Sequence, residues 1–279
     1  MTRDYVSVSV MIFTLNEEMN IGACLESVTW SDDIIVVDSG SSDKTRELSA
    51  RPCVRFFENK FLGFGTQRNW ALRNTSPKYD WVLILDADER VPQGLAEEIG
   101  RKIADADKSV AAFRLRRRFM IWGRWLKYSN LYPTWVVRLV HKERVRYVDR
   151  GHAETQELTG EVLSLGNDLI DENNKGIEAW FERQNRYSGQ EALYELEQAA
   201  QPAGFKQAFS SDPLKRRAGL RRLTRSIPGR PIWYFLYSYV IRGGFLEGRD
   251  GFMFCSMRAV YQAMIGIKKY DLRRRNVAQ

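Results

Sequence analysis

The stretch Trp81-Val82-Leu83-Ile84-Leu85-Asp86-Ala87-Asp88-Glu89 places three carboxylates directly after five apolar residues. An apolar run of this length predicts one buried strand. Asp86 and Asp88 follow the strand one residue apart. Carboxylate oxygens are ligands that Mg²⁺ and Mn²⁺ prefer, and substrate phosphates commonly complete such sites. The pair alone is also compatible with a solvated turn, so its interpretation depends on the rest of the chain.

Two earlier strands also end at carboxylates. Residues 6–15 predict a first strand, and Asn16-Glu17-Glu18 then offers an N-cap and two first-turn acids for a helix. Residues 33–37 predict a second buried strand, which ends at Asp38. A carboxylate in that place is costly unless it has a partner. The partner is either a ligand or the cap residues of the following loop, 39–43.

Strands and helices continue to alternate through the first half of the chain. The remaining elements predicted there are a helix at 44–50, a strand at 54–57, a helix capped by Thr66 and a helix at 92–105. This alternation predicts a mostly parallel sheet with helices on both faces. Ligands bind beyond the carboxyl ends of the strands in such sheets, so Glu17, Asp38 and the Asp86/Asp88 pair should meet at one edge.

The second half predicts a mixed sheet followed by helices. Strands are expected at 110–117, 134–141, 144–148 and 162–165, and a long helix at 177–198. The composition changes after Pro202. We therefore expect an α/β domain over residues 1–205 and a basic, aromatic and helical segment over residues 206–279.

The positive charge of the chain is concentrated in the last segment. Residues 206–279 hold 16 Lys or Arg and 4 Asp or Glu, a net charge of +12, which leaves −4 for residues 1–205. Such a segment favours a polyanionic partner, either a membrane surface or a nucleic acid. Its apolar, aromatic stretches at 231–241 and 251–267 predict a helical hairpin in the headgroup layer of an anionic membrane. A helical cap with a solvated basic face is the alternative.

Composition bounds the class of protein. With 279 residues, 44% of them hydrophobic, the chain can build a large core, and its many aromatic residues argue against disorder. Cys24, Cys53 and Cys255 are widely spaced and fit neither a disulfide framework nor a zinc site, which indicates a reducing compartment. We see no signal peptide and no run of about 18 apolar residues, so we expect a cytoplasmic protein without a spanning helix.

Two further groups of polar residues are candidates for contact with a second substrate. His152 and Glu154 alternate along an extended segment, which would place both on one side, and a carboxylate there could act as a general base. Arg183, Arg186 and Tyr187 lie in the middle of the long helix, where Arg side chains suit phosphate oxygens. A surface loop and a solvated helix face are the respective alternatives.

The order and spacing of these motifs resemble glycosyltransferase family 2 over roughly residues 6–190. The resemblance rests on Ile12-Phe13-Thr14-Leu15-Asn16-Glu17-Glu18, Ile35-Val36-Val37-Asp38-Ser39-Gly40-Ser41-Ser42-Asp43-Lys44-Thr45, Gln67-Arg68-Asn69 and Leu85-Asp86-Ala87-Asp88-Glu89. Within the family, the chain looks most like the lipopolysaccharide core β-glucosyltransferases. The resemblance implies a GT-A fold (a Rossmann-like mixed sheet with helices on both faces) for residues 1–205. It also implies inverting, metal-dependent hexosyl transfer from a nucleoside-diphosphate sugar, with UDP-sugars favoured.

The resemblance also implies roles for individual residues. The residues expected to bind the nucleotide are Thr14, Asn16, Glu17, Asp38, Arg68 and Asp86, and those expected to hold the Mn²⁺ or Mg²⁺ ion are Asp88 and Asp86. Relatives carry an adjacent His-Glu pair, whereas Ala153 separates His152 from Glu154 here. Glu154 is the predicted base, and His152 is the alternative base or an acceptor ligand. The residues expected on the diphosphate or acceptor side are Arg183, Arg186 and Tyr187.

The implied acceptor is a glycan or lipid-linked molecule of cell-envelope polysaccharide or lipopolysaccharide synthesis. The enzyme is then expected as a peripheral protein on the inner face of the cytoplasmic membrane. A dehydrogenase is excluded, because Thr14-Leu15-Asn16-Glu17 and not G-x-G-x-x-G follows the first strand. The alternative is a catalytically inactive or nucleic-acid-binding protein with a nucleotide-binding α/β domain. The basic segment lacks a recognisable nucleic-acid module, so no nucleic-acid partner is expected.

Overall fold

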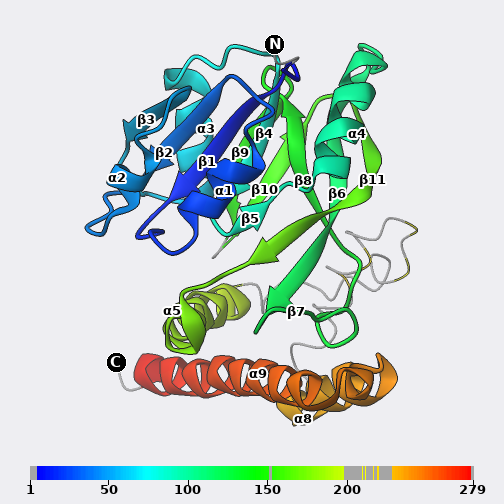
Figure 1. Cartoon of the computed structure of the whole chain (residues 1–279). Helices are drawn as coiled ribbons and strands as arrows, with labels where there is room; N and C mark the ends of the chain where they lie inside the picture. The colour runs from blue at the N-terminus through cyan, green and yellow to red at the C-terminus, as the bar shows by residue number, and fades with distance from the viewer. Residues whose placement is uncertain are drawn as a thin grey trace. The chain divides into compact units, whose positions relative to one another are not determined.

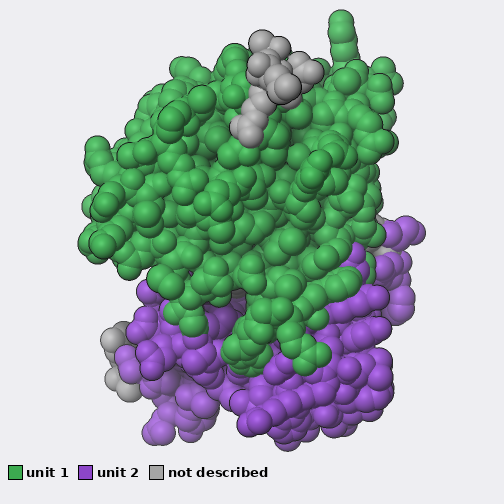
Figure 2. All heavy atoms as spheres, viewed as in Figure 1, with its two compact units in different colours: residues 1–125, 133–176 green, residues 126–132, 177–279 purple. Residues whose placement is uncertain are grey.

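The computed structural model describes residues 5–150, 153–197 and 228–277, with residues 209, 211, 216 and 219 between the last two ranges. The chain divides into two compact units (Figure 2). The first unit comprises residues 1–125 and 133–176, and the second comprises residues 126–132 and 177–279.

A nine-stranded mixed sheet forms the centre of the first unit (Figure 1). Its strands are β1 Ser9–Thr14, β2 Ile34–Asp38, β3 Val54–Glu58, β4 Trp81–Asp86, β5 Glu89–Arg90, β6 Val110–Ile121, β7 Arg124–Trp125, β8 Thr134–His141 and β11 Glu161–Glu172. The hydrogen-bonded order is β3-β2-β1-β4-β8-β6-β11-β5, with β7 paired to β6. Strands β3, β2, β1 and β4 are mutually parallel, and β8 runs antiparallel to both β4 and β6. A separate hairpin consists of β9 Val145–Arg150 and β10 Ala153–Leu158.

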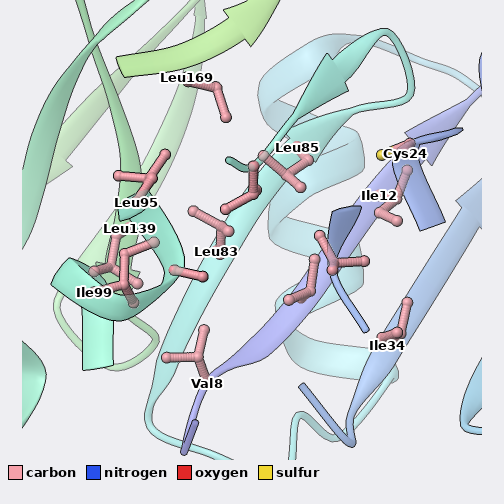
Figure 3. Close-up of a cluster of buried hydrophobic side chains, with 14 of the residues drawn as sticks. Val8, Ile12, Cys24, Ile34, Leu83, Leu85, Leu95, Ile99, Leu139 and Leu169 are labelled. Carbon is pink, nitrogen blue, oxygen red and sulfur yellow. The ribbon is translucent and has the colours of Figure 1, made fainter. Parts of the chain in front are cut away.

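Helices cover both faces of this sheet, as the alternation of elements predicted (Figure 1). They are α1 Ile21–Ser27, α2 Thr45–Ser49, α3 Phe64–Asn74 and α4 Gln93–Ala104. On one face, Cys24 of α1 and Ile99 of α4 join a cluster of buried side chains from the central strands (Figure 3). On the other face, Ala71 of α3 and Tyr147 of β9 belong to a second cluster. Because successive side chains of a strand point to opposite faces, both clusters draw on the same strands.

The first helix begins later than the sequence predicted. α1 starts at Ile21, and Asn16 has φ +53°, in the left-handed region that asparagine tolerates. Asn16 is therefore not the N-cap of α1. The residues between β1 and α1 form a turn, which leaves Glu17 just beyond the end of the strand.

The cap of α3 also differs from the prediction. The helix begins at Phe64, so Thr66 lies inside its first turn. The carboxylate of Asp149 in β9 accepts hydrogen bonds from Gly65 N at 2.6 Å, Thr66 N at 3.1 Å and Thr66 Oγ1 at 2.8 Å. A side chain from a distant strand thus satisfies the first N–H groups of the helix.

Strand β11 is longer than the predicted strand at 162–165. Asp168 and Asp171 interrupt its apolar pattern, yet both are buried. Asp168 forms ion pairs with Arg116 at 2.8 Å and Arg118 at 3.1 Å, both on the neighbouring β6. Because β11 runs in the same direction as β4, its end brings residues 173–175 to the sheet edge where β4 ends.

The second unit is helical. Its elements are α5 Gly176–Glu197, α8 Arg230–Leu236, the π-helix η2 Tyr237–Ile241, the 3₁₀-helix η3 Gly244–Glu247 and α9 Gly248–Val277. Helices α5 and α9 share a buried cluster of Ala192, Tyr261 and Ile265. The carboxylate of Glu195 accepts hydrogen bonds from Arg230 at 2.7 Å and Lys269 at 2.8 Å.

The predicted fold class, a mixed α/β sheet followed by a helical C-terminal segment, is confirmed. Helix α5, which the prediction assigned to the α/β domain, belongs to the second unit. The predicted boundary between residues 205 and 206 lies outside the described residues and stays a prediction. In the part of the chain that the structure describes, no helix is long and apolar enough to cross a membrane.

Candidate functional site

The carboxyl ends of neighbouring strands bring the predicted acidic residues to one edge of the sheet. Thr14, the last residue of β1, pairs with Asp38 at the end of β2. Phe13 pairs with Asp86 at the end of β4. We call this edge the strand-end rim, and it consists of residues 14–20, 38–45, 86–90 and 172–175.

Asp38 holds the loop that follows β2. Its carboxylate accepts hydrogen bonds from Thr14 Oγ1 at 2.6 Å, Ser41 Oγ at 2.5 Å, Gly40 N at 2.9 Å and Ser41 N at 2.7 Å. These four donors offset the cost of burying the carboxylate. They also fix loop 39–43 against the end of β1.

The loop after β1 is interlocked with the loop after β2. Asn16 N donates to Ser41 Oγ at 2.7 Å, and Asn16 Oδ1 accepts from Ser42 N at 2.8 Å. Glu18 N donates to Asp43 Oδ2 at 3.0 Å. The polar side chains predicted as helix caps therefore connect two loops of the rim.

Glu17 is partnered by a lysine that the sequence reasoning missed. Its carboxylate accepts hydrogen bonds from Lys175 Nζ at 2.5 Å and Asn20 Nδ2 at 2.8 Å. Burial raises the pKa of Glu17, and these two donors oppose the shift. Lys175 follows β11, whose full length the apolar pattern did not reveal, so its approach to Glu17 was not predicted.

Asp86 lies between two arginines. Its oxygens accept from Arg68 Nη2 at 3.1 Å and Arg138 Nη2 at 2.5 Å. Burial alone would raise the pKa of Asp86, but Arg138 and Arg68 outweigh it and hold the pKa well below its usual range. The Asp86 side chain is 38% accessible, whereas that of Arg68 is 4% accessible. A ligand at the rim can therefore reach Asp86 directly, and Arg68 acts on it through Asp86.

Glu89 and Arg138 complete a buried charge cluster with Arg68 and Asp86. Glu89 Oε1 accepts from Arg138 Nη2 at 2.7 Å, and Glu89 Oε2 accepts from Asp86 N at 3.0 Å. Burial raises the pKa of Glu89 to about 7, against the attraction of Arg138. Sequence reasoning gave neither Glu89 nor Arg138 a role. The available signal was an arginine inside the apolar strand at 134–141, because a buried cation requires an acidic partner.

Aromatic rings enclose the Arg68 guanidinium. Its central carbon lies 5.6 Å from the ring centroid of Phe13 and 5.6 Å from that of Tyr147. Burial lowers the pKa of Arg68, while Asp86 opposes the shift. Cation–π contacts of this kind hold the guanidinium in one orientation.

Asp88 differs from Asp86 in its surroundings. It is partly exposed, and Oδ2 accepts from Asn173 Nδ2 at 2.8 Å. Among the described residues, no three His, Cys, Asp or Glu side chains gather as a metal site. Mg²⁺ sites of enzymes commonly use one or two carboxylates, with substrate phosphates and water as the other ligands. Asp88 therefore fits an ion shared with a diphosphate rather than an ion enclosed by protein.

The structure does not bring the remaining five predicted residues into the strand-end rim as it is described. His152 lies outside the described residues. Glu154 belongs to β10, where its backbone pairs with Asp149, and its side chain is not described. The other three predicted residues are on α5, in the second unit: Arg183, Arg186 and Tyr187. The roles of all five stay predictions.

A mixed sheet with helices on both faces and acidic residues gathered at its parallel strand ends is a GT-A-like fold, as the sequence predicted. The chain matches the family model "Glycosyl transferase family 2" over residues 9–163. It belongs to this family. The matched range includes most of the rim and ends before Asn173 and Lys175.

Relatives are similar over nearly the whole chain. The lipopolysaccharide core biosynthesis glycosyltransferase LpsC of Rhizobium meliloti is 27% identical over 278 residues, which cover 94% of this chain and 92% of LpsC. An uncharacterized glycosyltransferase of Rickettsia typhi is 24% identical, with 97% of this chain and 89% of that protein covered. Among solved structures, S. aureus TarS 1-349 in complex with UDP-GlcNAc matches with a TM-score of 0.45 and 13% identity, over 96% of this chain and 91% of TarS.

Proposed function

We propose that this protein transfers a hexose from a nucleoside-diphosphate sugar, with UDP-sugars favoured, to an acceptor in lipopolysaccharide core or related cell-envelope synthesis. The observation that carries the proposal is the strand-end rim in a family 2 chain, where Glu17 from the loop after β1 lies at the same sheet edge as Asp86 and Asp88 from the end of β4. The similarity to LpsC along both chains supports the acceptor class.

In this proposal the nucleotide lies against the rim. Asn16, Glu17 and the accessible side of Asp86 contact the base and ribose. Thr14 and Asp38 keep loop 39–43 in place through their hydrogen bonds. Arg68 acts as a positioning residue, because its guanidinium is buried and pairs with Asp86.

Asp88 is the residue that would hold the divalent cation. Bound there, Mn²⁺ or Mg²⁺ would offset the negative charge of the diphosphate and favour its departure. Both oxygens of Asp86 are already paired with arginines, so Asp86 contributes to the nucleotide site more than to the ion. Arg183, Arg186 and Tyr187 are proposed for the diphosphate or acceptor side.

The transfer itself is a single displacement with inversion. An acceptor hydroxyl oxygen forms a bond to the anomeric carbon while the bond from that carbon to the diphosphate oxygen breaks. Glu154 takes the hydroxyl proton, with His152 as the alternative base, and the nucleoside diphosphate leaves with the electron pair.

The donor site is tested with Asp88→Asn and its matched control Asp107→Asn, which removes a charge from an exposed loop. A thermal-shift screen of nucleotides and UDP-sugars, with and without Mn²⁺, identifies the base and the ion. We expect the control to keep metal-dependent stabilisation by UDP and release of UDP from the donor, and Asp88→Asn to lose both. Unchanged turnover of Asp88→Asn would refute the metal role.

The base is tested separately with Glu154→Gln and the control Glu157→Gln, an exposed position in the same strand. We expect Glu154→Gln to bind UDP and Mn²⁺ normally and to lose sugar transfer to lipopolysaccharide of truncated core by about 10²-fold or more. If His152→Ala alone shows this loss, the base is His152. Binding of UDP by the wild type without any turnover would favour the catalytically inactive alternative.

A further inference from the structure

A continuous apolar face lies on the exposed side of the helix formed by α8 and η2. Its six residues recur at positions i, i+1, i+4, i+5, i+8 and i+9, a spacing that places them on one side of a helix. They are Ile232, Trp233, Leu236, Tyr237, Val240 and Ile241, with exposed fractions between 40% and 73%. Phe245 and Leu246 of η3 are 50% and 63% exposed and extend the set. We call these eight residues the apolar face.

The other side of the same helix already packs against α9. The rings of Phe235 and Tyr239 meet the ring of Phe252 edge-on, with centroids 5.7 Å and 5.6 Å apart. The guanidinium of Arg258, which is half-buried, lies 5.8 Å from the centroid of Tyr234. The packing against α9 therefore holds the helix in place without the apolar face, and the apolar face is accessible to a partner.

The charges beside the apolar face and the length of its helix indicate which kind of partner the face binds. Arg242 is half-buried beside the face, and Arg249 is exposed just beyond it and is followed by Asp250, while Arg230 is already paired with Glu195. Cations beside an apolar, aromatic surface favour anionic lipid headgroups. The twelve residues of α8 and η2 span about 18 Å, less than the roughly 30 Å hydrocarbon core of a bilayer. The helix suits the interface plane of a membrane.

A second copy of this chain is the other partner that could cover the apolar face. In a twofold dimer the same surface meets itself, so Arg242 and Arg249 would approach the same arginines of the other copy. An anionic lipid surface instead places negative charge opposite them.

We propose that the apolar face docks on an anionic phospholipid membrane, with its side chains at the level of the headgroups and upper acyl chains. This inference goes beyond the proposed function and does not depend on catalysis.

Vesicle flotation of the full chain tests the proposal. The test variant carries Trp233→Ser, Ile241→Ser and Leu246→Ser, all at positions that are at least 60% exposed. The control variant carries Leu62→Ser, Leu163→Ser and Leu193→Ser, which are exposed apolar positions outside the face. Vesicles contain either phosphatidylcholine alone or phosphatidylcholine with phosphatidylglycerol. Melting temperature and UDP affinity of each variant report folding and the donor site independently.

We expect the wild type and the control to float with the anionic vesicles and to bind neutral vesicles more weakly. The test variant should show a partition coefficient lower by about tenfold or more, at unchanged melting temperature. Equal flotation of the test variant and the wild type would overturn the proposal. A wild type that stays unbound and is dimeric by light scattering, with a monomeric test variant, would overturn it in favour of a second copy.

Discussion

Asp86 and Asp88 are one residue apart in the sequence but have different surroundings. Asp86 is paired with two arginines, while Asp88 is partly exposed and contacts Asn173. Side-chain chemistry alone does not separate them, because both are aspartates after the same strand. The difference comes from Arg138, which the neighbouring strand β8 supplies, and from Arg68 of α3. The two carboxylates of an Asp-x-Asp pair can thus serve different purposes.

The buried charge cluster leads to a stability prediction. Arg138→Leu removes the arginine that pairs with Glu89 and one of the two that pair with Asp86, and Glu89 is 1% exposed. Leaving a buried carboxylate unpaired costs about 3–5 kcal/mol. We expect the free energy of unfolding to fall by that amount in urea denaturation.

An ion pair at the surface, formed by the residue that directly follows β8, provides the control. Lys142 pairs with Asp80 at 3.1 Å, and Asp80 is 68% exposed. Lys142→Met should cost less than about 1 kcal/mol, because exposed pairs contribute little. Similar losses for Arg138→Leu and Lys142→Met would contradict the importance of the cluster.

The hairpin of η3 and α9 depends on two glycines that approach each other closely. A Cβ on Gly251 would lie 2.1 Å from the carbonyl oxygen of Gly244. Gly251→Ala should therefore force the backbone apart and lower the free energy of unfolding by about 1–3 kcal/mol. Thermal or urea unfolding of the full chain measures the effect.

The same helix contains the matched control. A Cβ on Gly266 would meet nothing within 4 Å, so Gly266→Ala should stabilise α9 by about 0.5–1 kcal/mol through its helix propensity. If both substitutions shift stability in the same direction, the close approach at Gly251 does not constrain the hairpin.

Periodicity predicted the buried strands well and the polar elements poorly. The strand at 134–141 was predicted with its observed ends, because Arg138 alone interrupts the apolar residues between Thr134 and His141. In β11, Asp168 and Asp171 break the pattern, and they are buried only because arginines of β6 pair with them. The cap of α3 by Asp149 is also a contact between distant residues. Neither partner is visible in a local window of sequence.

At the scale of the whole molecule, the sequence predicted those residues of the candidate site that lie at aligned strand ends. It did not predict those that reach the site through pairing between distant parts of the chain. The parallel order of β2, β1 and β4 is sufficient to bring Asp38 and Asp86 to one edge. Lys175 reaches that edge only because β11 extends to residue 172, which the apolar pattern did not indicate.

Because hydrogen bonds connect the rim loops, a bound donor should protect them as a group. We expect UDP with Mn²⁺ to slow amide hydrogen exchange in residues 16–18, 39–43 and 173–175 by similar factors. The turn at residues 122–123, which is not part of the rim, should be unchanged and serves as the internal control. Protection limited to a single loop would show that the loops respond separately.

The ion pair between Glu17 and Lys175 joins residues 158 positions apart, and this separation has a consequence for biosynthesis. Translation delivers β1, β2 and β4 early, but β8, which pairs with the free edge of β4, emerges later. Lys175 emerges only after the last strand of the sheet. A nascent chain on the ribosome therefore has its acidic strand ends before it has the lysine that neutralises Glu17, so the strand-end rim is completed only once the whole sheet has been synthesised.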